Sequence, residues 1–114
     1  MAKFESTKAI LKEVLAERGR QEQKWGVQNH SILHPETCYE PSVYKKMAEL
    51  HKIRCEARSK DGVLSWYDIL MEEVYEVFAE ETSENQREEL IQVAAVAVQM
   101  VEYLDRTNKN NPST

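Results

Sequence analysis

Glutamate and glutamine residues occur in two pairs whose spacing suits metal binding. Glu73 and Glu76 are three residues apart, and Glu89 and Gln92 repeat that spacing further along the chain. Residues three apart share one face of a helix, so two packed helices can bring four oxygen-bearing side chains together. Mg²⁺ prefers such oxygen ligands, and Mn²⁺ accepts them too. The pattern therefore predicts a divalent-cation site, and a solvated acidic face is the alternative.

Four helical segments must position these side chains. Apolar residues recur at helical spacing in four stretches that are separated by glycine, proline and polar residues. Ser65 with Asp68, and Ser83 with Gln86, resemble capping boxes before the third and fourth segments. We predict an all-α fold. The predicted helices cover residues 6–24, 42–59, 66–81 and 86–106.

The third segment carries an apolar stripe that sorts its glutamates. On a helical wheel Glu73 and Glu76 flank the stripe, whereas Glu72 points almost directly away from it. A ligand in a cleft between helices should lie beside the core. We therefore expect Glu73 and Glu76 to face the site and Glu72 to be solvated. The stripe consists of Leu70, Val74, Val77 and Phe78.

The fourth segment is apolar on every side after Glu89, which predicts burial on every side. Four helices of a chain of 114 residues can hardly enclose one helix so fully. We expect a second subunit to cover part of it. Small residues at Ala94, Ala95 and Ala97 would allow close approach of the helices.

The first segment changes character along its core-facing side. Arg18, Gln21 and Trp25 project from the same side as Leu11, so this side is apolar at first and polar later. The switch suggests a cavity at the end of the helix, although these polar groups can equally reach solvent where the helix leaves the bundle. Gly26 is a plausible stop signal.

Length and charge limit the classes of protein to which this chain can belong. The chain of 114 residues predicts one domain, which we place at residues 1–106, followed by a flexible tail at 107–114. A formal charge of −5 excludes a general electrostatic interaction with nucleic acid. The sequence has no apolar run of the ~20 residues that a membrane span needs, and its start does not resemble a signal peptide. Cys38 and Cys55 lack the spacing of a metal site, so we expect reduced thiols in a cytoplasmic protein.

Three stretches together resemble one protein family. EEVYE (72–76) followed by EELIQ (88–92) is similar to the EExxE … ExxD pattern of MazG-like nucleotide pyrophosphohydrolases, in the all-α NTP pyrophosphatase superfamily. ERGRQEQKWGVQNH (17–30) resembles the ERxRQxxKWGxQxH segment of phage and bacterial MazG-like proteins. LSWYDILMEEVYEV (64–77), which contains EEVYE, also fits the longer form of this family motif. The resemblance covers residues 17–105 and keeps the motifs in the family order.

The resemblance implies a four-helix core assembled into dimers or tetramers. It also implies Mg²⁺-dependent hydrolysis of nucleoside or deoxynucleoside triphosphates to the monophosphate and pyrophosphate. On this chain Glu73, Glu76 and Glu89 match the metal-binding glutamates, and we assign catalysis to Glu73 and Glu76. The fourth ligand position, an aspartate in the family, is Gln92 here. An amide oxygen can coordinate Mg²⁺ but brings no charge, so we expect weaker metal binding.

Substrate contacts are expected from the end of the first helix. In related folds, aromatic and polar residues there line the base pocket. By analogy, Trp25 stacks on the base, with a core tryptophan as the alternative. The chain ends before the basic residues that meet phosphates in longer family members, so Arg18, Arg20 and Lys24, or the basic second helix, would have to serve. The predicted substrate-binding residues are Arg18, Gln21, Lys24, Trp25 and His30.

Three functions fit these observations. The first is a nucleoside triphosphate pyrophosphohydrolase. The second is a non-catalytic nucleotide-binding or regulatory module of the same fold, which Gln92 favours because the metal site would be degenerate. The third is a structural helical dimer whose glutamates form a solvated face.

Overall fold

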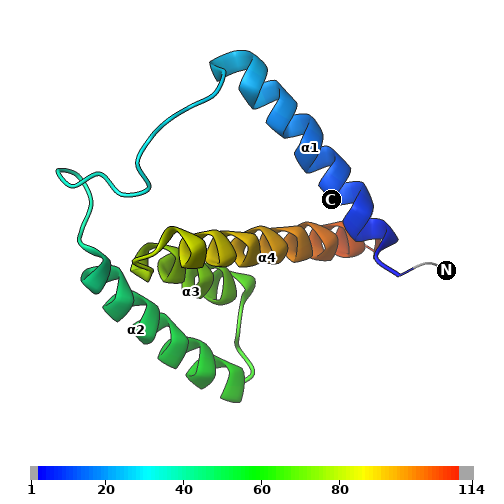
Figure 1. Ribbon diagram of the computed structural model, residues 1–114. Helices are drawn as coiled ribbons and strands as arrows, with labels where there is room; N and C mark the ends of the chain where they lie inside the picture. Colours follow the sequence, from blue (N-terminus) through cyan, green and yellow to red (C-terminus); the bar gives the residue numbers. More distant parts are fainter. Residues whose placement is uncertain (1–2, 111–114) are drawn as a thin grey trace. The chain divides into compact units, whose positions relative to one another are not determined.

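The computed structural model describes residues 3–110, which form four α-helices and contain no β-strand (Figure 1). The all-α prediction is therefore confirmed. Each predicted helix is present within a few residues of its expected bounds. Residues 107–110, predicted as the start of the tail, instead form the last turn of the fourth helix, and residues 111–114 lie outside the described part. The helices are α1 (Glu5–Trp25), α2 (Pro41–Lys60), α3 (Trp66–Ala79) and α4 (Ser83–Asn110).

The chain divides into two compact units. One unit contains α1 and the part of α4 from Ala97 onward. The other contains residues 31–96, namely the segment before α2, then α2, α3 and the first part of α4. The single domain over residues 1–106, and its assembly into an oligomer, stay predictions.

In the first unit, hydrogen bonds join the start of α1 to α4. Ser6 Oγ and Thr7 Oγ1 both donate to Glu102 Oε2, at 2.7 and 2.8 Å. These hydrogen bonds hold the pKa of Glu102 below its ordinary value. Ile10 is buried in this unit. At the other end of α1, Gly26 adopts a positive φ of 67° and its N–H donates to the Glu22 carbonyl. Glycine adopts that conformation at no steric cost, so the predicted stop at Gly26 is confirmed.

In the second unit, α2 packs along α3. Val77 of α3 is almost fully buried and Ala48 of α2 is buried too. Asp68, only 1% exposed, forms an ion pair with Arg58 and accepts hydrogen bonds from the Ser65 N–H and Oγ. Burial opposes ionisation of Asp68, but the hydrogen bonds from Ser65 and Arg58 outweigh it and hold its pKa below the ordinary value. The capping box predicted at Ser65 is confirmed, and its Asp68 also ties α3 to α2.

Aromatic contacts continue the α2–α3 interface. Tyr44 of α2 contacts the rings of Tyr39 and Phe78, with centroids 6.0 and 5.5 Å apart. His51 stacks on Tyr75 at 4.8 Å. The expectation that His51 lies on a helix surface is wrong, because its ring is partly buried between α2 and α3.

The start of α4 differs from its prediction in one detail. Thr82, rather than Ser83, caps the helix, because its Oγ1 accepts from the Asn85 N–H at 3.2 Å. Ser83 is already the first helical residue. Along α4, Leu90, Ile91 and Leu104 are exposed. The subunit predicted to cover this helix is not part of the structure, and its presence stays a prediction.

No helix within residues 3–110 is both long and apolar enough to cross a membrane. The expected absence of a membrane span is therefore confirmed for the described part of the chain.

Candidate functional site

Three of the four predicted metal ligands meet in the second unit. Carboxylate oxygens of Glu73, Glu76 and Glu89 all lie within 4.8 Å of one another. Glu73 and Glu76 come from one face of α3, and Glu89 comes from the second turn of α4. The short connection at residues 80–82 joins these two helices, and the Gln86 amide donates to the Glu80 carbonyl there. Three side chains of the two predicted pairs thus lie together, and Gln92 is not among them.

Two carboxylate oxygens of this cluster lack hydrogen-bond partners. Glu73 Oε2 and Glu89 Oε2 are buried atoms that receive no hydrogen bond from any described residue. Leaving a buried charged oxygen unsatisfied is costly. Together with the close approach of three carboxyl groups, this makes the cluster unfavourable for three bare negative charges.

The raised pKa values of Glu73 and Glu76 reflect this unfavourable clustering of negative charge. Burial raises the pKa of Glu76 to about 7, and the nearby Glu73 and Glu89 carboxylates add to the effect. Burial also raises the pKa of Glu73, with further contributions from Glu89 and Glu72. Both mechanisms disfavour the charged form of a carboxyl group. A divalent cation bound between the three groups would favour the charged carboxylates and lower these pKa values.

Glu72 has a different environment from the predicted one. Its side chain is partly buried and lies beside Cys55 of α2, so the expectation of a fully solvated carboxylate is wrong. Burial, followed by the negative charge of Glu72, raises the pKa of the Cys55 thiol to about 11. Cys55 Sγ donates to the Asp68 carbonyl at 3.3 Å. The thiol is therefore protonated and poorly nucleophilic at neutral pH.

Gln92 lies one turn after Glu89 on α4, and its side chain is exposed. Its position on the same face follows from the three-residue spacing. Its assignment as a fourth ligand stays a prediction.

A pocket of about 290 Å³ adjoins the glutamate cluster. Glu76 and Glu89 line it from α3 and α4, and Lys45 and Lys52 line it from α2. The basic second helix was a predicted alternative for phosphate binding, but neither lysine was predicted individually. The seven-residue spacing of Lys45 and Lys52 was the available signal, because it places both on one side of a helix.

The predicted substrate-binding residues lie in the first unit, where three of the five gather. Arg18, Gln21 and Trp25 line a pocket of about 410 Å³ at the end of α1. Arg18 Nη1 donates to Gln21 Oε1 at 3.0 Å. Trp25 is 55% exposed, so it is not a core tryptophan in the described chain. Lys24 is not among the residues lining this pocket, but its ammonium lies 4.9 Å from the Trp25 ring centroid.

His30 is exposed and is not among the residues that line this pocket. The expected contact between His30 and a nucleotide stays a prediction.

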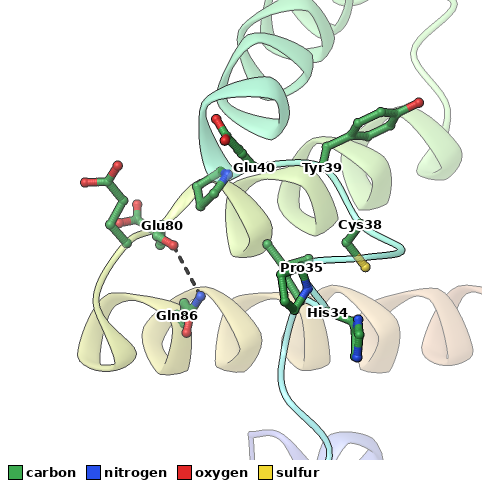
Figure 2. Close-up of a pocket in the computed structure, with 10 residues that line it drawn as sticks. His34, Pro35, Cys38, Tyr39, Glu40, Glu80 and Gln86 are labelled. Carbon is green, nitrogen blue, oxygen red and sulfur yellow. Dashed lines mark hydrogen bonds between the residues drawn. The ribbon is translucent and has the colours of Figure 1, made fainter.

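A larger pocket, of about 460 Å³, lies elsewhere in the second unit (Figure 2). His34, Cys38 and Tyr39 line it from the segment before α2, and Glu80 and Gln86 line it from the α3–α4 connection. This pocket was not predicted from the sequence. Its lining contains no lysine or arginine, so it offers no strong partner for a phosphate group.

The cluster of Glu73, Glu76 and Glu89 fits a hard divalent cation. All three donors are carboxylate oxygens, which Mg²⁺ and Mn²⁺ prefer. The two buried oxygens without hydrogen bonds would gain a partner, and the carboxylate repulsion would be relieved. With only three carboxylates, such an ion would keep positions for water or ligand oxygens.

Comparison with known proteins finds no match for this chain among models of protein families, curated proteins or solved structures. The MazG-like resemblance therefore stays a prediction from the sequence motifs.

Proposed function

We propose that this protein is a MazG-like, Mg²⁺-dependent nucleoside or deoxynucleoside triphosphate pyrophosphohydrolase that releases the monophosphate and pyrophosphate. The observation that carries the proposal is the convergence of Glu73, Glu76 and Glu89 with two buried oxygens that lack hydrogen bonds. These three residues are the ones that the EExxE … ExxD resemblance assigns to the metal.

In this proposal Glu73, Glu76 and Glu89 hold the metal, and Gln92 contributes an amide oxygen or a bound water. A bound Mg²⁺ would polarise phosphoryl oxygens and lower the pKa of a coordinated water. The protein's own carboxylates would fix the position of the ion, and their remaining oxygens would accept hydrogen bonds from water and orient it. The pKa of Glu76 is about 7 in the metal-free protein, and a bound cation would lower it, so Glu76 would act as a charged carboxylate ligand.

Following the resemblance, we propose that the pocket at the end of α1 binds an aromatic base. Trp25 offers an exposed aromatic face for stacking, which is worth about 1–3 kcal/mol per base and tolerates any base. Arg18 and Gln21 supply polar groups to the same pocket. We further propose that the protein works as a homodimer or homotetramer, since Leu90, Ile91 and Leu104 are exposed on α4.

A nucleotide panel tests the activity. Wild-type protein with Mg²⁺ or Mn²⁺ should release pyrophosphate from at least one common nucleoside or deoxynucleoside triphosphate, and Glu76→Gln should abolish the release. Glu88→Gln is the matched control, because Glu88 is an exposed residue of α4 next to the cluster. Absence of pyrophosphate from every nucleotide at high protein concentration would refute the hydrolase.

The second candidate is a nucleotide-binding or regulatory module without catalysis. Gln92 favours it, because the uncharged amide weakens the metal site. In that case Mg²⁺ and a nucleotide would raise the melting temperature together while the nucleotide is not consumed. The purely structural reading predicts no thermal response to Mg²⁺ or to any nucleotide.

A further inference from the structure

Two lysines of α2 face the pocket beside the glutamate cluster. Lys45 and Lys52 are seven residues apart, so they lie two turns apart on the same side of the helix. Both line the pocket of about 290 Å³ that Glu76 and Glu89 also line. Between them Ala48 is 8% exposed, and its small side chain contributes to the pocket wall. α2 therefore presents two ammonium groups to the space next to the candidate metal.

Neither Lys45 nor Lys52 forms an ion pair with a described residue. The ion pairs found within residues 3–110 join Lys8 to Glu5, Arg18 to Glu22, Arg20 to Glu17 and Arg58 to Asp68. Lys45 and Lys52 take part in none of them, although carboxylates line the same pocket. Both side chains are exposed, so they keep their hydration and their freedom to move toward a ligand.

The charges of the pocket define what it can accept. Besides Glu76 and Glu89, Glu49 and Glu80 line it, so four carboxylates accompany two ammonium groups. A bare polyanion would be repelled by this excess of negative charge. A polyphosphate bound to a divalent metal ion would complement both sets of charges in the pocket. The metal ion would contact the carboxylates, and the free phosphate oxygens would contact the lysines.

We propose that Lys45 and Lys52 bind the phosphate groups of a metal–polyphosphate ligand whose metal is held by Glu73, Glu76 and Glu89. The inference rests on the metal site of the proposed function and assigns its phosphate subsite to α2 of the same chain. The shared chemistry is a triphosphate, which is either inorganic or part of a nucleotide. The larger pocket beside His34 and Tyr39 lacks lysine and arginine and is not a comparable phosphate site.

Calorimetry with two probes tests the lysines separately from the metal. The first probe is Mn²⁺ alone, and the second is inorganic triphosphate with saturating Mg²⁺. In Lys45→Gln/Lys52→Gln the affinity for Mg²⁺-triphosphate should fall at least about tenfold, because two charge-assisted hydrogen bonds are lost. Mn²⁺ affinity should stay the same or rise, because positive charge is removed near the carboxylates. Triphosphate in EDTA should not bind.

The matched control is Lys46→Gln/Lys60→Gln, which removes the same charge from α2 at exposed positions outside the pocket. Its affinity for Mg²⁺-triphosphate should change less than about twofold. Lys45→Arg/Lys52→Arg should retain most of the binding. Equal losses in the two glutamine double variants, or an unchanged affinity in Lys45→Gln/Lys52→Gln, would overturn the proposal.

The same variants separate this inference from the proposed activity. If nucleotides are hydrolysed with an unchanged KM in Lys45→Gln/Lys52→Gln, the phosphate subsite is wrong and the hydrolase stands. If Mg²⁺-triphosphate binding depends on the lysines but no nucleotide is hydrolysed, the subsite stands and the hydrolase is wrong. If wild-type protein binds neither Mn²⁺ nor Mg²⁺-triphosphate, both are wrong. Tighter binding of a nucleotide than of triphosphate would identify the nucleotide as the natural source.

Discussion

Replacing Glu76 with glutamine removes one charge from a crowded carboxylate cluster and should stabilise the metal-free protein at high pH. In the folded chain the pKa of Glu76 lies at about 7 instead of the ordinary 4.5. A carboxyl group with a raised pKa stabilises the fold below its unfolded pKa, and that contribution is lost as the pH rises through the folded pKa. The penalty is therefore absent near pH 4, grows through the window up to about pH 7, and is constant above it.

The size of the penalty follows from the same two pKa values. Each tenfold change in acidity corresponds to about 1.4 kcal/mol, so the difference amounts to roughly 3 kcal/mol. Glu76 is only partly buried, and solvent screening should reduce this to about 1–2 kcal/mol. Glutamine preserves the size and shape of the side chain. Glu76→Gln should therefore raise the free energy of unfolding by about 1–2 kcal/mol at pH 8 in EDTA.

Urea denaturation at pH 4.5 and pH 8 measures this difference, with Glu88→Gln as the exposed control. A second measurement uses the metal. Saturating Mn²⁺ should raise the melting temperature of the wild type, and a concentration of one hundred times Kd corresponds to about 2.7 kcal/mol of stabilisation. Glu76→Gln should lose most of that response. Equal stabilisation of Glu76→Gln at both pH values, or a full Mn²⁺ response in this variant, would refute the carboxylate cluster as described.

Other parts of the chain give further expectations. Gln92→Asp should tighten Mn²⁺ binding by about tenfold or raise turnover if the residue completes the metal shell, and calorimetry that finds unchanged or weaker affinity would exclude Gln92 as a ligand. Trp25→Ala should raise the Kd for a nucleotide about 5- to 100-fold without changing the Kd for inorganic triphosphate, and equal effects on both would argue against base stacking. For the wild type, Mn²⁺ affinity should increase from pH 6 to pH 8 because Glu76 must lose its proton, and a pH-independent Kd would contradict its raised pKa. Asp68→Asn should lower the melting temperature by roughly 5–10 °C through loss of the Arg58 ion pair and the α3 cap, whereas a melting temperature within a degree of wild type would show that this contact contributes little.

The sequence alone determined the helical fold and the approach of Glu73 and Glu76 to Glu89. Apolar periodicity located all four helices, and glycine, proline and polar residues marked their limits. The three-residue spacing of Glu73 and Glu76, together with a short connection to the next helix, was sufficient to predict that they meet Glu89. These properties depend on local geometry, and local geometry follows from the order of residues along one or two helices.

Contacts between segments distant in the sequence required the tertiary structure. The position of Lys45 and Lys52 beside Glu76 depends on how α2 packs along α3, and a helical wheel of α2 cannot show which helix its basic side faces. For the same reason the wheel of α3 placed Glu72 in solvent, whereas α2 brings Cys55 against it. The buried oxygens of Glu73 and Glu89, and the pKa of Glu76 near 7, likewise arise from burial and from charges on neighbouring helices. Desolvation and electrostatic coupling act through space, so only the packed helices could reveal them.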